Sequence, residues 1–187
     1  MSKLIVILGP MKGGKSFETI GRFMPLKYTD ISFGLFQPKR NVRDEQIQSK
    51  NGNIIPSQKI SNLNELLNKN LDIIGIDEIH MFEENEIQAI ETLLKRKNQQ
   101  IIMSGLDTDY IGKMFPVIRK ILELGPNKII YKRAVCEVCK KMEAVYTQIF
   151  DKTGKPVLDK LPPVVPDDGS YIYKPVCRNC FIRKSNF

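Results

Sequence analysis

The segment GPMKGGKS at 9–16 contains residues whose types and spacing suit binding of a nucleoside triphosphate. Gly9, four residues and then Gly14-Lys15-Ser16 complete the P-loop pattern, after an apolar run and before a helix-like segment. Glycines let backbone N–H groups point at phosphate, Lys15 reaches the outer phosphates, and the Ser16 hydroxyl binds Mg²⁺. The alternative is a chance glycine-rich turn. The predicted nucleotide-binding residues here are Gly9, Pro10, Met11, Lys12, Gly13, Gly14, Lys15 and Ser16.

A pair of acids, Asp77 and Glu78, closes the apolar run at 73–76. An acid in the position of Asp77 is typical of a residue that holds Mg²⁺ directly or through water. Glu78 then falls at the carboxyl edge of a parallel sheet, where ligands of such sheets bind. A carboxylate there can accept a proton from an attacking hydroxyl or water. The alternative is an acid pair that only stabilises a helix N-terminus through its dipole.

All four cysteines fall into two pairs, Cys136-x-x-Cys139 and Cys177-x-x-Cys180. Two such knuckles predict a structural zinc site in which four thiolates close the metal's shell. The long segment between the pairs would be pinned at both ends by the metal. Two disulfides or free thiols are the alternatives, and a reducing compartment disfavours the disulfides.

The segment SGLDTDYIGKMF at 104–115 and the single histidine, His80, are further candidates. Leu106, Tyr110 and Phe115 do not fit one helical face, so they either line an apolar pocket at the sheet edge or belong to an ordinary core. His80 lacks the cysteine or histidine neighbours of a metal site. We therefore expect it to line a pocket.

Alternating strand and helix patterns must position these residues. The strand-like runs are nearly continuous and rich in Ile or Val, as is typical of strands buried on both faces; they lie at 4–8, 31–36, 72–77, 100–105 and 128–132. Helix-like segments at 16–24, 62–69 and 83–98 separate several of them. The last has acids in its first turn and bases in its last. The pattern predicts an α/β fold with a parallel sheet.

The character of the sequence changes after Arg133. The cysteines follow this point, and prolines prevent a regular helix over 161–170. We therefore predict two domains, a P-loop domain at 1–133 and a zinc-binding domain at 134–187.

Net charge and composition limit the kinds of partner and the cellular location that we expect. The 187 residues carry a net charge of +8, and residues 1–60 hold much of the basic excess. Phosphate binding, a nucleic-acid surface and a solvated basic face all fit this distribution. The sequence has no apolar run of membrane-spanning length and no secretory signal pattern. We expect a cytoplasmic protein that does not contact membranes.

Taken in order, these segments resemble the type II thymidine kinase family, which includes the human cytosolic enzyme. GPMKGGKS looks like the family's GPM-x-x-GK[ST], GIDEIHMF like GIDE-x-Q-F-F, and GLDTDYIGKMF like GLD-x-DF-RG-x-PF. CEVCKKMEAVYTQ and YKPVCRNC look like its two knuckles. The resemblance covers most of the chain. It implies a RecA-like P-loop sheet plus a small C-terminal zinc ribbon that carries a substrate lasso.

The resemblance also implies roles for particular residues. Glu78 matches the general base for the nucleoside 5′-hydroxyl, Asp77 the Mg²⁺-associated acid, and Arg43 a phosphate-proximal arginine that acts with Lys15. His80 joins the cofactor-binding group. The positions around the thymine base are Met11, Met81, Leu106, Tyr110 and Phe115. The lasso positions are Val164, Val165, Pro166, Asp167, Asp168 and Tyr173.

The sequence departs from the family pattern at several positions. The family's D-x-R reads Asn41-Val42-Arg43, and the glutamine of DE-x-Q is His80. Met81 replaces an aromatic residue, Ile111 an arginine and Met114 a proline. Because phosphoryl transfer depends on positioning and charge placement, we expect these changes to affect rate, metal affinity and base selectivity more than reaction class.

The resulting hypothesis is ATP-dependent 5′-phosphorylation of thymidine, the salvage route to dTMP, with Glu78 as general base and with Mg²⁺ and structural Zn²⁺. The resemblance implies a homotetramer, a nucleoside triphosphate as feedback inhibitor and no nucleic-acid partner. One alternative is a nucleic-acid-stimulated P-loop ATPase with a zinc ribbon, in which Glu78 activates water. Another is a degenerate kinase retained as a binding protein.

Overall fold

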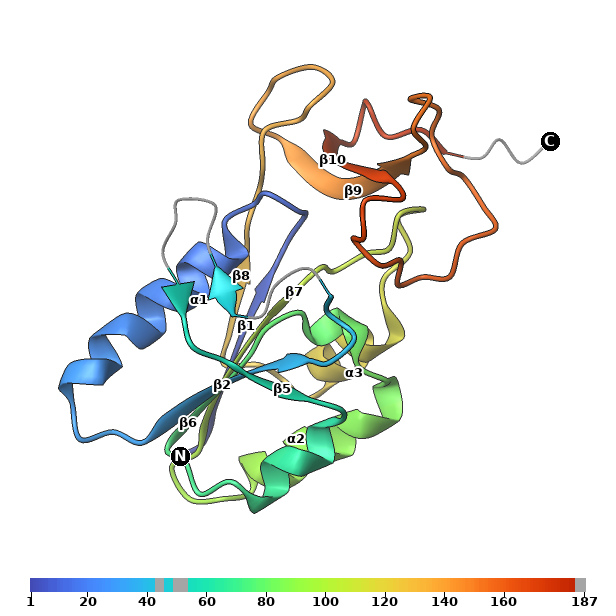
Figure 1. Ribbon diagram of the computed structural model, residues 1–187. Coiled ribbons are helices and arrows are strands. Elements are labelled where there is room, and N and C mark those ends of the chain that lie inside the picture. The colour runs from blue at the N-terminus through green and yellow to red at the C-terminus, as the bar shows by residue number, and fades with distance from the viewer. Residues whose placement is uncertain (43–45, 49–53, 184–187) are drawn as a thin grey trace.

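A parallel six-stranded sheet forms the centre of the computed structural model, which describes residues 1–42, 46–48 and 54–183 (Figure 1). The strand order is β5-β2-β6-β7-β1-β8, and each neighbouring pair is parallel. The strands are β1 Lys3–Leu8, β2 Phe33–Pro38, β5 Gln58–Ile60, β6 Ile73–Ile76, β7 Gln100–Gly105 and β8 Lys128–Tyr131. Each of the five predicted runs forms one of these strands. The predicted parallel α/β architecture is therefore confirmed.

Helices cover both faces of this sheet. The helix α1, Lys15–Phe23, buries Ile20 and Phe23 in one core cluster, whereas α2, Ile87–Leu94, and α3, Pro116–Glu123, pack in another. Neighbouring β1 residues alternate between the two clusters, as the strand's period of two requires. Since all six strands run the same way, their carboxyl ends meet at one edge.

The helical segments differ in detail from the sequence prediction. Residues 62–69 form a 3₁₀ helix, η2 Leu63–Asn68, and the Asn62 side chain caps it by accepting from the Asn64 N–H at 3.1 Å. The three acids at the start of 83–98, Glu83, Glu84 and Glu86, precede α2. They form a 3₁₀ turn, η4 Glu84–Glu86, closed by a capping box between Glu83 and Glu86. Short 3₁₀ helices also occur at η1 Met24–Tyr28 and η3 Ile79–Met81.

The chain after β8 forms a smaller unit over the carboxyl edge of the sheet, which we call the zinc module, residues 134–183 (Figure 1). Its antiparallel strands are β9 Ala144–Phe150 and β10 Ile172–Cys177. It has its own small core, in which the Tyr146 and Phe181 rings stack with centroids 4.5 Å apart. A separate hairpin, β3 Ile47–Gln48 with β4 Ile54–Ile55, packs against α1 through Ile47 and Ile55.

None of the helices in the described part of the chain has both the length and the apolarity needed to cross a membrane.

Candidate active site

The glycine-rich loop leaves β1 at the carboxyl edge and enters α1. Gly9 has φ 141°, and a Cβ there would lie 2.4 Å from the Lys132 carbonyl oxygen, so only glycine fits. Gly14, in the left-handed region at φ 80°, caps α1. Lys15 begins the helix, and its Nζ donates to the Pro10 carbonyl at 2.9 Å. The loop thus brings an ammonium group and a helix N-terminus together, as a phosphate site requires.

The outer turn of this loop contacts the zinc module. The Met11 N–H donates to Thr147 Oγ1 on β9 at 2.9 Å. Lys12 has a left-handed φ of 62°, which costs a non-glycine residue about 1 kcal/mol. Its ammonium forms an ion pair with Glu137, between the first two cysteines. These two predicted nucleotide-binding residues therefore also join the two parts of the molecule.

Asp77 is held by a chain of buried hydroxyl groups that crosses from α1 to β6. Thr19 Oγ1 donates to Ser104 Oγ at 3.1 Å, and Ser104 Oγ donates to Asp77 Oδ1 at 2.5 Å. Burial, together with the charge of Glu78, raises the pKa of Asp77 to about 6. A cation beside Asp77 would remove this cost of ionisation. A buried carboxylate and the Ser16 hydroxyl are oxygen donors that suit Mg²⁺.

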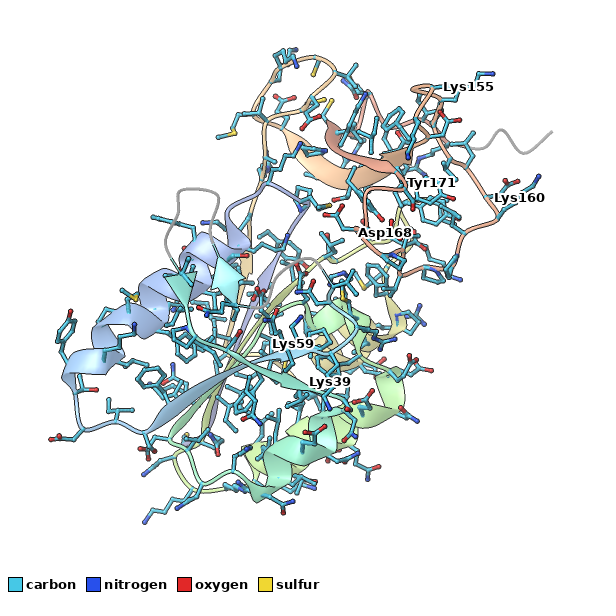
Figure 2. All side chains as sticks on the ribbon, viewed as in Figure 1. Lys39, Lys59, Lys155, Lys160, Asp168 and Tyr171 are labelled. Atoms are coloured by element: carbon cyan, nitrogen blue, oxygen red, sulfur yellow. The ribbon has the colours of Figure 1, made fainter. Side chains whose placement is uncertain are left out.

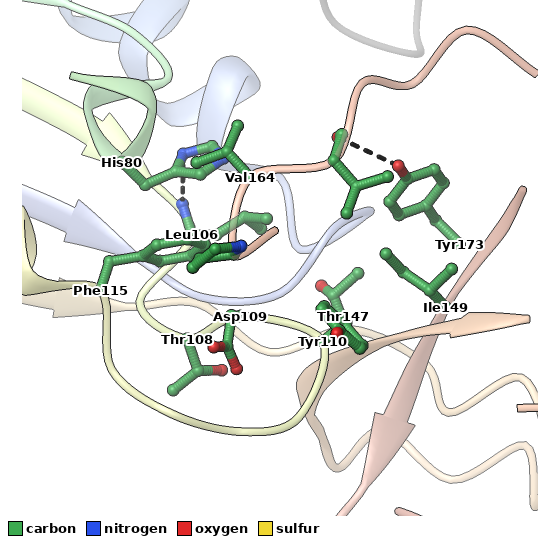
Figure 3. A pocket seen from close by; sticks show the side chains of 12 residues that line it. His80, Leu106, Thr108, Asp109, Tyr110, Phe115, Thr147, Ile149, Val164 and Tyr173 are labelled. Atoms are coloured by element: carbon green, nitrogen blue, oxygen red, sulfur yellow. Dashed lines mark hydrogen bonds between the residues drawn. The ribbon is translucent and has the colours of Figure 1, made fainter. Parts of the chain in front are cut away.

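Glu78 stands at the join between β6 and η3 in a left-handed conformation with φ 51°. Such strain in a non-glycine residue is typical of functional sites. Glu78 Oε2 lies 3.4 Å from His80 Nδ1, and that nitrogen accepts from the Leu106 N–H at 3.3 Å (Figure 3). His80 thus links the base candidate to the loop that follows β7.

Gly105 allows this close approach. A Cβ at Gly105 would lie 3.2 Å from the His80 backbone nitrogen and 3.0 Å from Ile79. The imidazole is buried and packs against the Phe115 ring, with centroids 5.0 Å apart. His80 is therefore a packed residue of the site wall.

A cavity of about 30 Å³ lies between the sheet edge and the zinc module (Figure 3). It is bounded by η3, the loop after β7, β9, β10 and the segment 163–165. Among its lining residues are His80 and six predicted substrate positions, Leu106, Tyr110, Phe115, Val164, Val165 and Tyr173. Leu106, Phe115 and Val164 also pack in the large core cluster, so the two interpretations offered for segment 104–115 are compatible.

Two tyrosines attach the lasso, residues 151–171, to the rest of the molecule. Tyr110 Oη donates to the Leu161 carbonyl at 3.0 Å and accepts from the Leu161 N–H at 3.2 Å. Tyr173 Oη donates to the carbonyls of Val165 at 3.0 Å and Pro166 at 2.9 Å. Burial, aided by the Asp167 and Asp168 carboxylates, raises the pKa of Tyr173, so its hydroxyl stays a donor. These hydrogen bonds flank the cavity-lining residues 163–165 and hold them against the site in this closed arrangement.

Several predicted residues lie apart from this cavity. Met11 and Met81 are not among its lining residues. Asp167 is half-buried, whereas Asp168 is exposed and accepts from the Ser170 N–H at 2.9 Å (Figure 2). Lys155 and Lys160 project outward from the same lasso in that view. Arg43 lies outside the described residues.

Sequence reasoning did not assign Ser104 or five residues that line the cavity to the site; the five are Thr108, Asp109, Thr147, Ile149 and Pro163. Thr147 and Ile149 line the cavity from the same face of β9, and Ser104 holds Asp77. The strand's alternation contains the signal for the first two, since residues two apart share a face. A hydroxyl at the end of the apolar run QIIMSG was the signal for Ser104.

The four cysteines converge as predicted, with their sulfur atoms all within 4.8 Å of one another. No disulfide joins these four cysteines, and Cys139 Sγ lies 3.7 Å from Cys177 Sγ. A tetrahedral zinc site with Zn–S bonds of about 2.3 Å separates its sulfurs by about 3.8 Å. Burial opposes ionisation of Cys136, but N–H groups of Cys139, Cys177 and Val138 outweigh it and lower its pKa to about 6. The donor set therefore fits zinc.

Comparison with known proteins gives one family. The chain matches the family described as thymidine kinase over residues 2–181. It is 32% identical over 167 residues to a thymidine kinase of Ureaplasma urealyticum serovar 10, covering 80% of this chain and 74% of that protein. It is 33% identical over 143 residues to thymidine kinases from two strains of Ureaplasma parvum serovar 3, covering 72% of this chain and 63% of each relative.

Among solved structures, a homoserine dehydrogenase from S. aureus aligns at 18% identity with a TM-score of 0.27, covering 80% of this chain and 36% of that one. A score this low does not define a common fold. The family match over residues 2–181 and the 32% identity with a member show that this chain belongs to the thymidine kinase family.

Proposed function

We propose that this protein transfers the γ-phosphate of ATP to the 5′-hydroxyl of thymidine, with Glu78 as general base. One observation supports the assignment of the phosphate loop to the ATP and of the cavity to the nucleoside. Thr147 accepts a hydrogen bond from the phosphate loop at Met11, and the same residue lines the cavity that contacts His80. The donor loop and the acceptor cavity are therefore neighbours, and His80 connects that cavity to Glu78.

In this proposal each charged residue has a separate task. Glu78 takes the proton of the 5′-hydroxyl as that oxygen bonds to the γ-phosphorus and the bond to ADP breaks. Lys15 and Arg43 stabilise the charge on the transferred group. Ser16 and Asp77 would hold Mg²⁺, which supplies charge neutralisation on the phosphates. Glu78 directly follows Asp77, the metal-associated acid, at the sheet edge, and the Glu78 side chain is 12% exposed.

The lasso acts as a lid in the same proposal. A cavity of 30 Å³ holds about two water molecules, so a pyrimidine base enters only if part of the wall moves. The sheet side of the wall belongs to the large core, whereas the lasso side is held by the packing of Val164 against that core and by the hydroxyls of Tyr110 and Tyr173. We infer that this segment opens for the nucleoside and then closes to exclude water from the γ-phosphate.

The experiment measures ADP release from ATP and Mg²⁺ with each of five nucleosides, namely thymidine, deoxyuridine, deoxycytidine, deoxyadenosine and deoxyguanosine. Parallel reactions contain single-stranded DNA or RNA in place of the nucleoside. We expect release to depend on a pyrimidine deoxynucleoside, and on thymidine most strongly. Release that depends on nucleic acid would instead support the P-loop ATPase alternative.

Family membership and the two cores lead to further proposals. We propose a kinase domain at 1–133 and a zinc-binding lasso domain at 134–187, supported by the separate core of the zinc module. We also propose a cytoplasmic homotetramer inhibited by the thymidine triphosphate end product. Light scattering on the purified chain tests the tetramer, and a titration with the triphosphate tests the inhibition.

A further inference from the structure

We propose that Glu137 and Thr147 of the zinc module are positioning residues that hold the phosphate loop in its nucleotide-binding shape. Lys12 is the loop residue through which Glu137 acts. The inference rests on the proposed binding of ATP by the loop. It gives the zinc module a role on the donor side of the reaction, in addition to its role in carrying the lasso.

The two contacts fall on consecutive residues at the outermost turn of the loop. Thr147 Oγ1 accepts from the Met11 N–H at 2.9 Å, and Glu137 pairs with the Lys12 ammonium. The inner part of the loop is fixed differently. There, Gly13 N donates to Pro10 O at 3.2 Å and Gly9 packs against the Lys132 backbone. The zinc module therefore restrains the turn of the loop at Met11 and Lys12.

The backbone of Lys12 explains why such a restraint matters. Lys12 has φ 62°, a conformation that residues other than Gly, Asn and Asp rarely adopt. This left-handed residue lies between Met11 and Gly13, and its conformation turns consecutive N–H groups of the loop toward one side. An ion pair on the Lys12 side chain favours the strained conformation over relaxed alternatives. The loop is then already ordered when the nucleotide arrives, which lowers the cost of binding.

Glu137 is itself well placed for this task. It lies within the first knuckle, between Cys136 and Cys139, and its N–H donates to the Pro175 carbonyl on β10 at 2.9 Å. Thr147 is fixed in the β9–β10 ladder opposite Pro175. Both positioning residues thus come from the rigid part of the zinc module rather than from the lasso.

The test compares two variants that make the same charge change in the same module. Glu137→Gln removes the ion pair, and Glu143→Gln removes an exposed acid next to β9. The measurement is calorimetric binding of the non-hydrolysable ATP analogue AMP-PNP with Mg²⁺ to the full-length protein, without nucleoside. We expect Glu137→Gln to bind about three- to fivefold more weakly than wild type, the size expected for a partly exposed ion pair, and Glu143→Gln to match wild type.

Two further comparisons separate positioning from simple attraction between charges. In a Lys12→Met background, Glu137→Gln should have no additional effect, because the pair is already absent. Thr147→Val, which lacks the acceptor, should weaken AMP-PNP binding, whereas Thr147→Ser should retain it. Zinc content should stay at one per chain in every variant, which excludes loss of the module as the cause.

The outcomes distinguish this inference from the proposed function. Equal AMP-PNP affinity of wild type, Glu137→Gln and Thr147→Val overturns the positioning roles and leaves the kinase proposal intact. Equal weakening by Glu137→Gln and Glu143→Gln also overturns them, since it would reflect net charge alone. Failure of wild type itself to bind AMP-PNP would contradict the nucleotide site, and with it the proposed function.

Discussion

The donor and acceptor sides of the site are built in different ways. On the donor side, one continuous stretch from β1 through the loop into α1 supplies the phosphate-binding residues, and two glycine positions fix its path. On the acceptor side, the residues come from separate elements: His80 comes from η3, and the others come from the loop after β7, from β9, from the lasso and from β10. The donor side therefore depends chiefly on local backbone geometry, with its Met11–Lys12 turn also held by the zinc module, whereas the acceptor side depends on how the zinc module sits on the sheet.

Glu78 lies where the two sides meet, so its replacement gives the largest expected effect. Glu78→Gln keeps the side chain's size and removes the base, and turnover should fall by at least about 100-fold. Binding of AMP-PNP and of thymidine should change little, because Glu78 accepts the proton of the 5′-hydroxyl during phosphate transfer and not during binding. Steady-state kinetics and calorimetry measure these quantities. Near-wild-type turnover would reject Glu78 as the base.

Removal of a zinc ligand should affect the acceptor side more than the donor side. Cys177→Ser takes one thiolate from the cluster at the start of the second knuckle, where β10 ends. We expect loss of bound zinc and a rise in the KM for thymidine of at least about 10-fold, because the lasso loses its anchor. AMP-PNP affinity should fall by a smaller factor. Elemental analysis measures the bound zinc. Equal factors for the rise in the KM for thymidine and the loss of AMP-PNP affinity would contradict the contrast between the two sides.

Ser104→Ala should do the reverse and weaken the donor side alone. Ser104 Oγ donates to Asp77 at 2.5 Å, and loss of a hydrogen bond that orients a metal ligand typically costs about 10-fold in metal affinity. The measurement is the Mg²⁺ concentration that half-saturates AMP-PNP binding. Ser104→Thr, which keeps a hydroxyl, is the matched control. A changed KM for thymidine with unchanged Mg²⁺ dependence would contradict the assignment.

Tyr110→Phe gives the smallest effect and the most local one. The hydroxyl exchanges two hydrogen bonds with Leu161 while the ring stays buried in the cavity wall. Its removal should raise the KM for thymidine by about fivefold, the size of one ordinary hydrogen bond, and leave AMP-PNP binding unchanged. Ile111→Ala, at an exposed neighbouring position, is the control. No difference between the two variants would mean that Tyr110 does not hold the lasso.

The donor side was easier to predict from the sequence than the acceptor side. Its loop residues are consecutive in the chain, whereas the acceptor residues come from separate elements. The phosphate loop, the acid pair and the cysteine pairs are short patterns whose residues stand next to each other, and the five apolar runs mark most of the sheet. The short strand β5, the hairpin β3–β4 and the helix α3 were missed. Three-residue and two-residue strands carry almost no periodic signal, whereas Pro116 at the first turn of α3 was a usable signal for a helix start.

The acceptor cavity shows more clearly what sequence patterns do not predict. Resemblance indicated Leu106, Tyr110, Phe115 and Tyr173, but the contacts of Thr147 with both the cavity and the loop depend on how the zinc module sits on the sheet. Pattern alone does not specify that placement. Lys12 shows the same limit, since its partner Glu137 is remote in sequence and close only in the fold.

The central claim is that phosphate passes from the loop to the 5′-oxygen of thymidine. The most direct measurement is identification of the product by ³¹P NMR after reaction of the full-length protein with ATP, Mg²⁺ and thymidine, beside a reaction with 5′-deoxythymidine. The account predicts thymidine 5′-monophosphate in equal amount to ADP, and no phosphorylated product from the analogue that lacks the 5′-hydroxyl. Inorganic phosphate as the main product, formed at the same rate with either nucleoside, would contradict it.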